Sequence, residues 1–251
     1  MTLDHPRDVP DGSSAPPQPP VTSFEDPRAL QILAAEHSSL AAARGLSYNE
    51  AFTRVGIFLS FLSTSFVALA LIAQATSFGE PFLAISAIVL TFDLIVGLVT
   101  LGRVLGTTSD DLRAVHGMAR VRHGYLEIAP LLEPYFTTGT SDDPAGVMKA
   151  YRAPTTAVRG VLYALTTSTG MMAIVVALIG GVLAGVLALI AGLGPGLAFA
   201  LGAAAAIVLF GALGAMAGAY FTRDQASLEV RFPSSPSPAP TSPPRADAST
   251  G

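Results

Sequence analysis

The sequence predicts an all-α membrane protein, a four-span transmembrane helical bundle built from two hairpins. Of its 251 residues, 51% are hydrophobic and only 13% are charged, whereas soluble domains carry about 25% charged residues. Apolar runs long enough to cross a bilayer recur along the chain, and polar segments separate them. Together these observations indicate four transmembrane helices, with small helical segments on the cytoplasmic side.

The composition argues against several classes of function. The net charge is −4, so no basic surface of the kind that binds nucleic acid is expected. The chain has no cysteine, which excludes disulfides, thiolate metal sites and thiol nucleophiles. No nucleotide-binding glycine loop, HExxH motif or nucleophile elbow occurs in it. We therefore expect a protein that is not an enzyme and that has no cofactor and no metal.

The N-terminal region is expected to be a disordered, proline-rich tail followed by a short cytoplasmic helix. Asp26 and Pro27 are typical of an N-cap and of the first helical residue. This helix should stop near Gly45. Ser47 and Glu50 then have the spacing of a capping box, which predicts that a new helix begins there and enters the membrane.

The first hairpin is predicted from two apolar runs, at about 55–73 and 81–101, joined by a short loop. The second run holds thirteen Leu, Ile, Val or Phe residues around a single acid, Asp93. On a biological insertion scale those thirteen contribute about −4 to −8 kcal/mol, which outweighs about +2.5 to +3.5 kcal/mol for a central aspartate. The run should therefore insert into the bilayer despite its acid.

A long polar segment follows, and within it Asp110 and Asp111 come directly after Thr108 and Ser109. That pattern is typical of a helix start, and Pro130 discourages a helix from continuing beyond Ala129. The apolar stripe of this helix, expected to pack on other cytoplasmic helices, comprises Met118, Val121, Tyr125 and Ile128. Asp143-Pro144 predicts a second, shorter helix.

The second hairpin is predicted from apolar runs at about 169–191 and 196–221. Glycine and alanine recur along both at intervals of four residues, which lets helix backbones approach closely in lipid. We expect these ridges to pack the two helices together. The alternative is a homo-oligomer contact through Gly181, Gly185, Gly214 and Gly218.

Asp93 is the first candidate functional residue, because an ionisable group at that depth is costly and usually faces a partner or a cavity. No Lys, Arg or His lies within the spans. Hydroxyl residues of the first span lie at the same depth, so the predicted polar site comprises Asp93, Ser60, Ser63 and Thr64. Three interpretations stay open: a structural interhelical hydrogen bond from a protonated carboxyl, a proton or cation site, and a side chain that faces lipid.

A basic face on the central helix is the second candidate, with Arg113, His116, Arg120 and His123. The two histidines are seven residues apart, whereas metal ligands on one helix are usually three or four apart, and basic neighbours disfavour a cation. A solvated face is expected. The alternative is a contact with anionic lipid headgroups or with an acidic partner.

The distribution of basic residues predicts the topology. All fourteen Lys and Arg lie in the N-terminal region, the central segment or the C-terminal region, and the two short loops that join the spans have none. The positive-inside rule then places both termini in the cytoplasm and the chain in the cell membrane.

Two stretches resemble a known family. They are LQILAAEHSSLAAARGLSYNEAFTRVGIFLSFLS, from Leu30, and MARVRHGYLEIAPLLEPYFTTGTSDDPAGV, from Met118. Both are similar to a family of integral membrane proteins of high-GC, actinobacterial-type bacteria, and the resemblance covers about residues 29–150. It implies a multi-pass membrane protein, but it implies no activity and no catalytic residue.

The function predicted from the sequence is a non-enzymatic scaffold or regulatory protein whose cytoplasmic helices bind a protein partner. The alternative is a small proton or ion transporter or channel subunit that uses Asp93. Gly97 is the only glycine or proline in the interior of the second span, which does not match the broken helices of many transporters. The predicted segments are a tail (1–22), a cytoplasmic helix (23–46), a first hairpin (47–102), a cytoplasmic segment (103–159), a second hairpin (160–223) and a tail (232–251).

Overall fold

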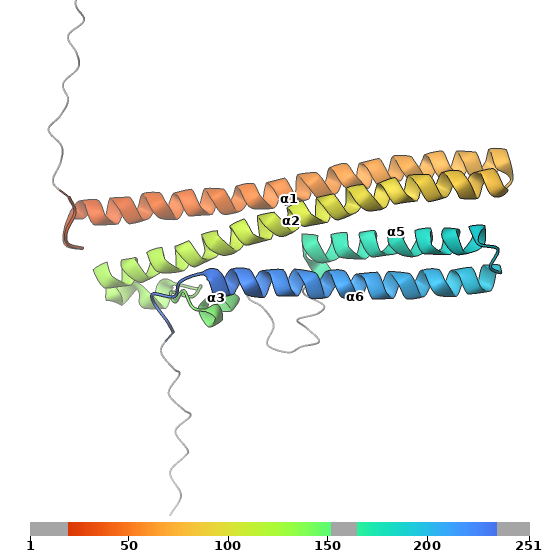
Figure 1. Ribbon diagram of the computed structural model, residues 1–251. Coiled ribbons are helices and arrows are strands. Elements are labelled where there is room, and N and C mark those ends of the chain that lie inside the picture. Colours follow the sequence, from red (N-terminus) through yellow and green to blue (C-terminus); the bar gives the residue numbers. More distant parts are fainter. Residues whose placement is uncertain (1–19, 152–164, 235–251) are drawn as a thin grey trace, which may run out of the picture.

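The computed structural model describes residues 20–151 and 165–234, and this part of the chain is all-α (Figure 1). The elements are α1 (Pro27–Thr76), α2 (Glu80–Ile128), the 3-10 helix η1 (Pro130–Tyr135), α3 (Pro144–Ala150), α5 (Ser168–Ile190) and α6 (Pro195–Ser227). Four of them, α1, α2, α5 and α6, are long and apolar enough to cross a membrane. The predicted fold class is therefore confirmed, while most of the two predicted tails lies outside the described residues.

α1 is one continuous helix of 50 residues, so the predicted break near Gly45 is wrong. The helix starts as predicted, because the Asp26 carboxylate accepts a hydrogen bond from the backbone N–H of Arg28 at 2.9 Å. The predicted capping box does not form: Ser47 donates its hydroxyl to a carbonyl one turn earlier, and Glu50 pairs with arginines. An interior glycine costs a helix about 1 kcal/mol, and packing along α2 outweighs that cost.

α2 is also continuous, over 49 residues, so the helix start predicted at Asp110 is wrong as well. Asp111 lies inside α2, where its carboxylate accepts from Nε of Arg44 on α1 and from the hydroxyl of Tyr151, each at 2.7 Å. The predicted end before Pro130 is confirmed. In the predicted apolar stripe Met118 and Val121 are buried, and Tyr125 and Ile128 are partly buried.

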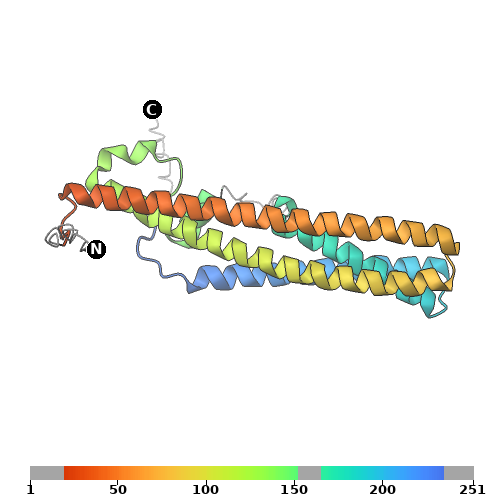
Figure 2. The same cartoon turned by 90° about the horizontal axis from the view of Figure 1, so that it is seen from above.

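The four long helices form a row rather than a closed ring (Figures 1 and 2). α2 packs against α1 and α5, and α5 packs against α2 and α6, so α1 and α6 lie at the two edges. Phe58, Leu101 and Val176 are at most 2% exposed and form the core of this row. Large apolar side chains such as Ile88 and Val99 are about 70% exposed, which suits a bilayer, because lipid tails are as apolar as leucine.

α1 and α2 continue beyond their apolar portions as a paired polar extension. Glu50 marks the boundary, where its carboxylate binds Arg54 at 2.9 Å and Arg103 at 2.8 Å. We call residues 27–53 of α1 and 104–128 of α2 the stalk. At 1.5 Å per residue the stalk is about 40 Å long. The start of α1, the end of α2 and the end of α6 point towards the same end of the molecule (Figure 1).

α5 and α6 form the second hairpin, as predicted. Gly192 supplies the turn with a φ of +81°, a left-handed conformation that glycine adopts without strain. A Cβ added to Gly181 would lie 2.7 Å from the carbonyl oxygen of Gly202, so only glycine permits this close approach. The first turn of α5 is capped by Thr167, whose hydroxyl accepts from the N–H of Gly170 at 3.1 Å.

Candidate functional site

Asp93 lies fully buried within the apolar half of the molecule. One turn further along α2, a Cβ added to Gly97 would lie 3.0 Å from Phe58 of α1 and from Val176 of α5, so both neighbouring helices flank α2 at this level. The hydroxyl of Ser65 on α1 donates to Asp93 Oδ1 at 2.9 Å. Asp93 Oδ2 is buried and has no hydrogen-bond partner among the described residues. Since burying a lone carboxylate is very costly, this position favours a neutral carboxyl.

The three hydroxyl residues predicted to surround Asp93, which are Ser60, Ser63 and Thr64, do not reach it. Each donates to a carbonyl four residues earlier in α1, and each is exposed. The predicted depth was nearly right, but the predicted rotation of α1 was wrong, because each residue turns a helix by about 100°. The spacing of apolar residues could have identified Ser65 as the partner. Ser65 shares one face of α1 with the buried residues Phe58, Leu62 and Leu69.

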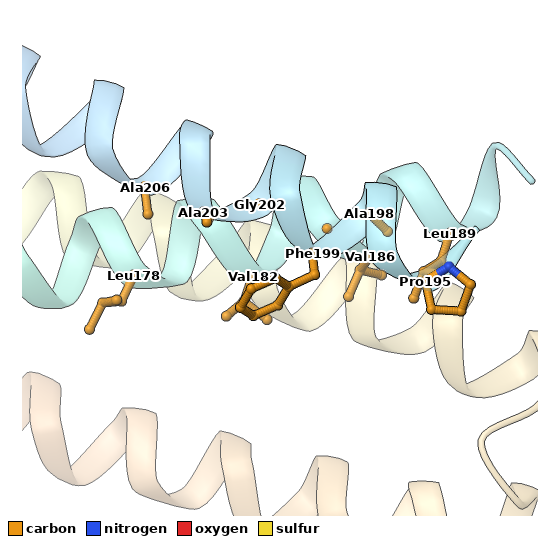
Figure 3. Close-up of a pocket in the computed structure, with 12 residues that line it drawn as sticks. Leu178, Val182, Val186, Leu189, Pro195, Ala198, Phe199, Gly202, Ala203 and Ala206 are labelled. Carbon is orange, nitrogen blue, oxygen red and sulfur yellow. The ribbon is translucent and has the colours of Figure 1, made fainter. Parts of the chain in front are cut away.

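Two apolar grooves open on the sides of the apolar half of the molecule. The larger, of about 520 Å³, lies between α5 and α6, where Gly181, Gly185 and Gly202 leave room beside Phe199 (Figure 3). The smaller, of about 250 Å³, lies among α1, α2 and α5. Asp93 lines neither groove. Both grooves suit lipid tails, and neither offers a polar path to the buried acid.

The predicted basic face of α2 is partly covered: His116 is buried and Arg120 and His123 are half-buried, so the expectation of a solvated face holds only for Arg113. The cover consists of residues 228–234, which follow α6 and which we call the C-terminal strap. His123 stacks its ring on Phe232 of the strap at 4.1 Å, and the Arg120 guanidinium donates to the carbonyl of Glu229. Arg113 stays 59% exposed, with ion pairs of 3.5 and 3.7 Å to nearby aspartates.

Asp142 holds the strap in place. Its side chain is 0% exposed and accepts from the backbone N–H groups of Arg231 and Phe232, at 3.0 and 2.7 Å, and from Arg120 Nε at 2.8 Å. Burial raises the pKa of a carboxyl, but these hydrogen bonds hold the pKa of Asp142 below its usual value. Asp142 of this chain is therefore one acidic partner of the basic face. Residues 232–234, which were predicted to belong to a disordered tail, are bound to Asp142 and Asp143.

His116 completes this cluster. Its side chain is 7% exposed, and its Nε2 lies 3.7 Å from Asp142 Oδ2 without a hydrogen-bond partner among the described residues. Burial, together with the charge of Arg120, lowers the pKa of His116 below its usual value. The imidazole is therefore neutral at neutral pH. Within residues 20–151 and 165–234, no three His, Cys, Asp or Glu side chains are grouped so that they could hold a metal ion.

The glycines of the predicted oligomer contact divide into two groups. Gly181 and Gly185 pack against α6 within the hairpin, so they serve the fold of the single chain. Gly214 and Gly218 are exposed on α6, and an added Cβ there would meet nothing within 4 Å. Only this second pair is free to contact another copy of the chain.

Comparison with known proteins adds no relative: no family model, no curated protein and no solved structure matches this chain. The resemblance to a membrane-protein family of actinobacterial type therefore stays a prediction. Function has to be inferred from the fold and from the contacts described above.

Proposed function

We propose that this chain is a non-enzymatic scaffold or regulatory protein of the bacterial cell membrane, which presents its stalk to a protein partner in the cytoplasm. The observation that carries the proposal is that α1 and α2 leave their apolar portions without a break and stay paired to the end of the stalk. A stiff helical pair about 40 Å long can hold a binding surface well clear of the bilayer.

Exposed apolar side chains at the end of the stalk support a binding role. Large apolar residues flank the start of α1 and follow the end of α2, far from the portion that a bilayer would cover. They are Phe24, Leu30, Ile32, Leu131, Leu132 and Tyr135, with exposed fractions of 45–88%. We call them the tip residues. Apolar side chains gathered on a water-exposed surface are typical of sites where proteins bind one another.

The orientation in the proposal rests on the positive-inside rule. Arg54, Arg103 and Arg223 lie near span ends on the side of the stalk, and the turns at 77–79 and 191–194 carry no basic residue. A basic side therefore faces the cytoplasm, together with both termini and the stalk.

Proton or cation movement through Asp93 is the second candidate function. The buried, unpartnered Oδ2 favours it, because ionisable groups inside the membrane often mark ion or proton pathways. The continuity of α2 and the absence of Asp93 from both grooves favour a structural role instead. A proton flux in reconstituted vesicles that Asp93→Asn abolishes would support this candidate.

The scaffold proposal is tested by site-specific photo-crosslinking in living cells. A photoreactive amino acid at Ile32 or Leu131 should form an adduct with the same protein partner, since both side chains lie at the tip. The matched control is Ile88, which is 71% exposed but lies in the apolar half. It should give no such adduct. Absence of a protein adduct at both tip positions, or the same adduct at Ile88, would contradict the proposal.

A further inference from the structure

Arg122 of α2 is a largely buried cation that has no acceptor among the described residues. It is 9% exposed, and no hydrogen bond or ion pair joins it to any other residue in the described part of the chain. The segment 152–164 contains no Asp or Glu that could serve as its partner. Arginine is seldom buried unless it is paired, because an uncompensated buried charge is strongly destabilising.

The charges around Arg122 are positive rather than negative. The charge of Arg44 on α1 reaches Arg122, and the charge of Arg122 reaches His37 on α1. Asp111 lies on the same face of α2 three turns earlier, but its carboxylate already accepts from Arg44 and Tyr151. No carboxylate among the described residues therefore pairs with Arg122 or with His37 Nδ1.

A second unpartnered group, His37 of α1, packs against α2 one turn from Arg122. His37 Nδ1 is buried and has no hydrogen-bond partner among the described residues. The ring is held against α2 by stacking on Tyr125, with ring centroids 5.9 Å apart. Leu33 and Leu40, one turn to either side of His37, pack on glycines of α2 and fix the two helices in register.

We propose that Arg122 and His37 form a binding site for an oxyanion, a phosphoryl group or a carboxylate, between α1 and α2 in the stalk. A guanidinium matches two oxygens of such a group with parallel N–H donors. His37 donates to another oxygen when Nδ1 carries a proton. The bound anion would also offset the mutual repulsion of Arg122 and Arg44.

Two sources of the oxyanion are compatible with the position of the site. Arg122 lies 19 residues beyond Arg103, about 28 Å from the apolar boundary, so headgroups of the surrounding bilayer are out of reach. The first source is a soluble phosphate or phosphorylated compound. The second is a carboxylate of this chain's own N-terminal region, which carries Asp4, Asp8 and Asp11.

The test uses the full-length protein in detergent, unfolded by heat in phosphate and in chloride at equal ionic strength. Phosphate should raise the melting temperature of the wild type, and R122Q should abolish this rise. The control is R113Q, which removes an exposed arginine from the same helix and should keep the response. R122K keeps the buried charge but loses the paired donors, so it should weaken the apparent phosphate affinity roughly tenfold.

A triple variant, D4N/D8N/D11N, distinguishes the two sources. If the chain's own carboxylate fills the site, phosphate should not change the melting temperature of the wild type. Phosphate should then raise the melting temperature of the triple variant, and adding R122Q to the triple variant should remove that rise. A phosphate response that survives in R122Q at the strength seen in R113Q would overturn the proposal. So would the absence of any phosphate response in both the wild type and the triple variant.

Discussion

Single carboxyl groups hold separate segments of this protein together, and Asp142, which fixes the C-terminal strap, is the clearest example. The C-terminal strap has no helix or strand of its own, and one buried side chain binds two of its backbone N–H groups. Asp142→Ala leaves those donors unpaired and removes the carboxylate acceptor of Arg120 Nε. Because each charge-assisted hydrogen bond contributes about 1.5–3 kcal/mol, trypsin should cut after Arg231 at least roughly tenfold faster in this variant.

The control for that experiment is Glu229→Ala, which removes an exposed carboxylate from the same strap and should leave the cleavage rate nearly unchanged. Equal rates for the wild type and Asp142→Ala would show that Asp142 does not hold the strap.

The strap should also loosen in acid, because two of the titratable groups beneath it, His116 and Asp142, change stability in the same direction. The lowered pKa of His116 means that the folded state favours the neutral ring, so its contribution is present above about pH 6.5 and declines as the pH falls below that value. The lowered pKa of Asp142 adds a contribution that is present above about pH 3.9 and is lost at still lower pH.

Hydrogen exchange at the amides of Arg231 and Phe232, corrected for intrinsic rates, measures this effect. Protection should fall between pH 7 and pH 5, and His116→Gln should flatten that dependence. Protection that stays constant over this range in the wild type would contradict the assignment to His116.

The contact between Asp93 and Ser65 predicts a modest effect on stability. Ser65→Ala removes the only hydrogen-bond partner that Asp93 has in the described chain, and interhelical bonds of this kind contribute about 0.6–1.7 kcal/mol. Ser60→Ala is the matched control, since that hydroxyl bonds its own helix. Unfolding in detergent should separate the two variants, and equal effects would mean that the rotation of α1 is wrong.

At the scale of elements, the continuity of α1 predicts opposite results for two glycine substitutions. Gly45 lies inside the helix, and an added Cβ meets nothing within 4 Å, so Gly45→Ala should stabilise the protein by about 0.5–1 kcal/mol. Gly181→Ala should destabilise it, because the new Cβ would lie 2.7 Å from a carbonyl oxygen of α6. Thermal unfolding checks both, and destabilisation by Gly45→Ala would indicate a helix end at this position.

Helix ends could be predicted from the sequence where a local signal acted alone. The cap at Asp26 and the stop before Pro130 depend on adjacent residues, and both are confirmed. The signals at Gly45 and Asp110 failed because pairing of α1 with α2 overrides them. Asp111, for example, binds across to the other helix instead of capping its own.

The candidate sites could be predicted only in part, for related reasons. Composition identified Asp93 and its depth, but its partner depended on the rotation of α1, which only packing determines. The strap had no signal at all, since its contacts join residues about 90 positions apart in the sequence. No sequence pattern around Arg122 indicates a binding site. The site is recognised only because the structure buries Arg122 without an acceptor among the described residues.

The whole molecule is divided into two halves with different surroundings. Exposed apolar side chains cover the outside of the four-helix row, whereas the stalk, α3 and the strap carry the polar and charged contacts. Such a division fits a membrane protein with its polar mass on one side. The central claim is that the stalk lies in the cytoplasm and that the turn between α1 and α2 lies outside.

Labelling of single cysteines with a membrane-impermeant maleimide tests that claim most directly, because the native chain has no cysteine. Ala35→Cys reports on the stalk and Gln74→Cys on the last turn of α1 beside the loop to α2, and both positions are exposed. Gln74→Cys should react in intact cells, and Ala35→Cys should react only in inverted membrane vesicles. Labelling of Ala35→Cys in intact cells, or of both positions from the same side, would contradict the account.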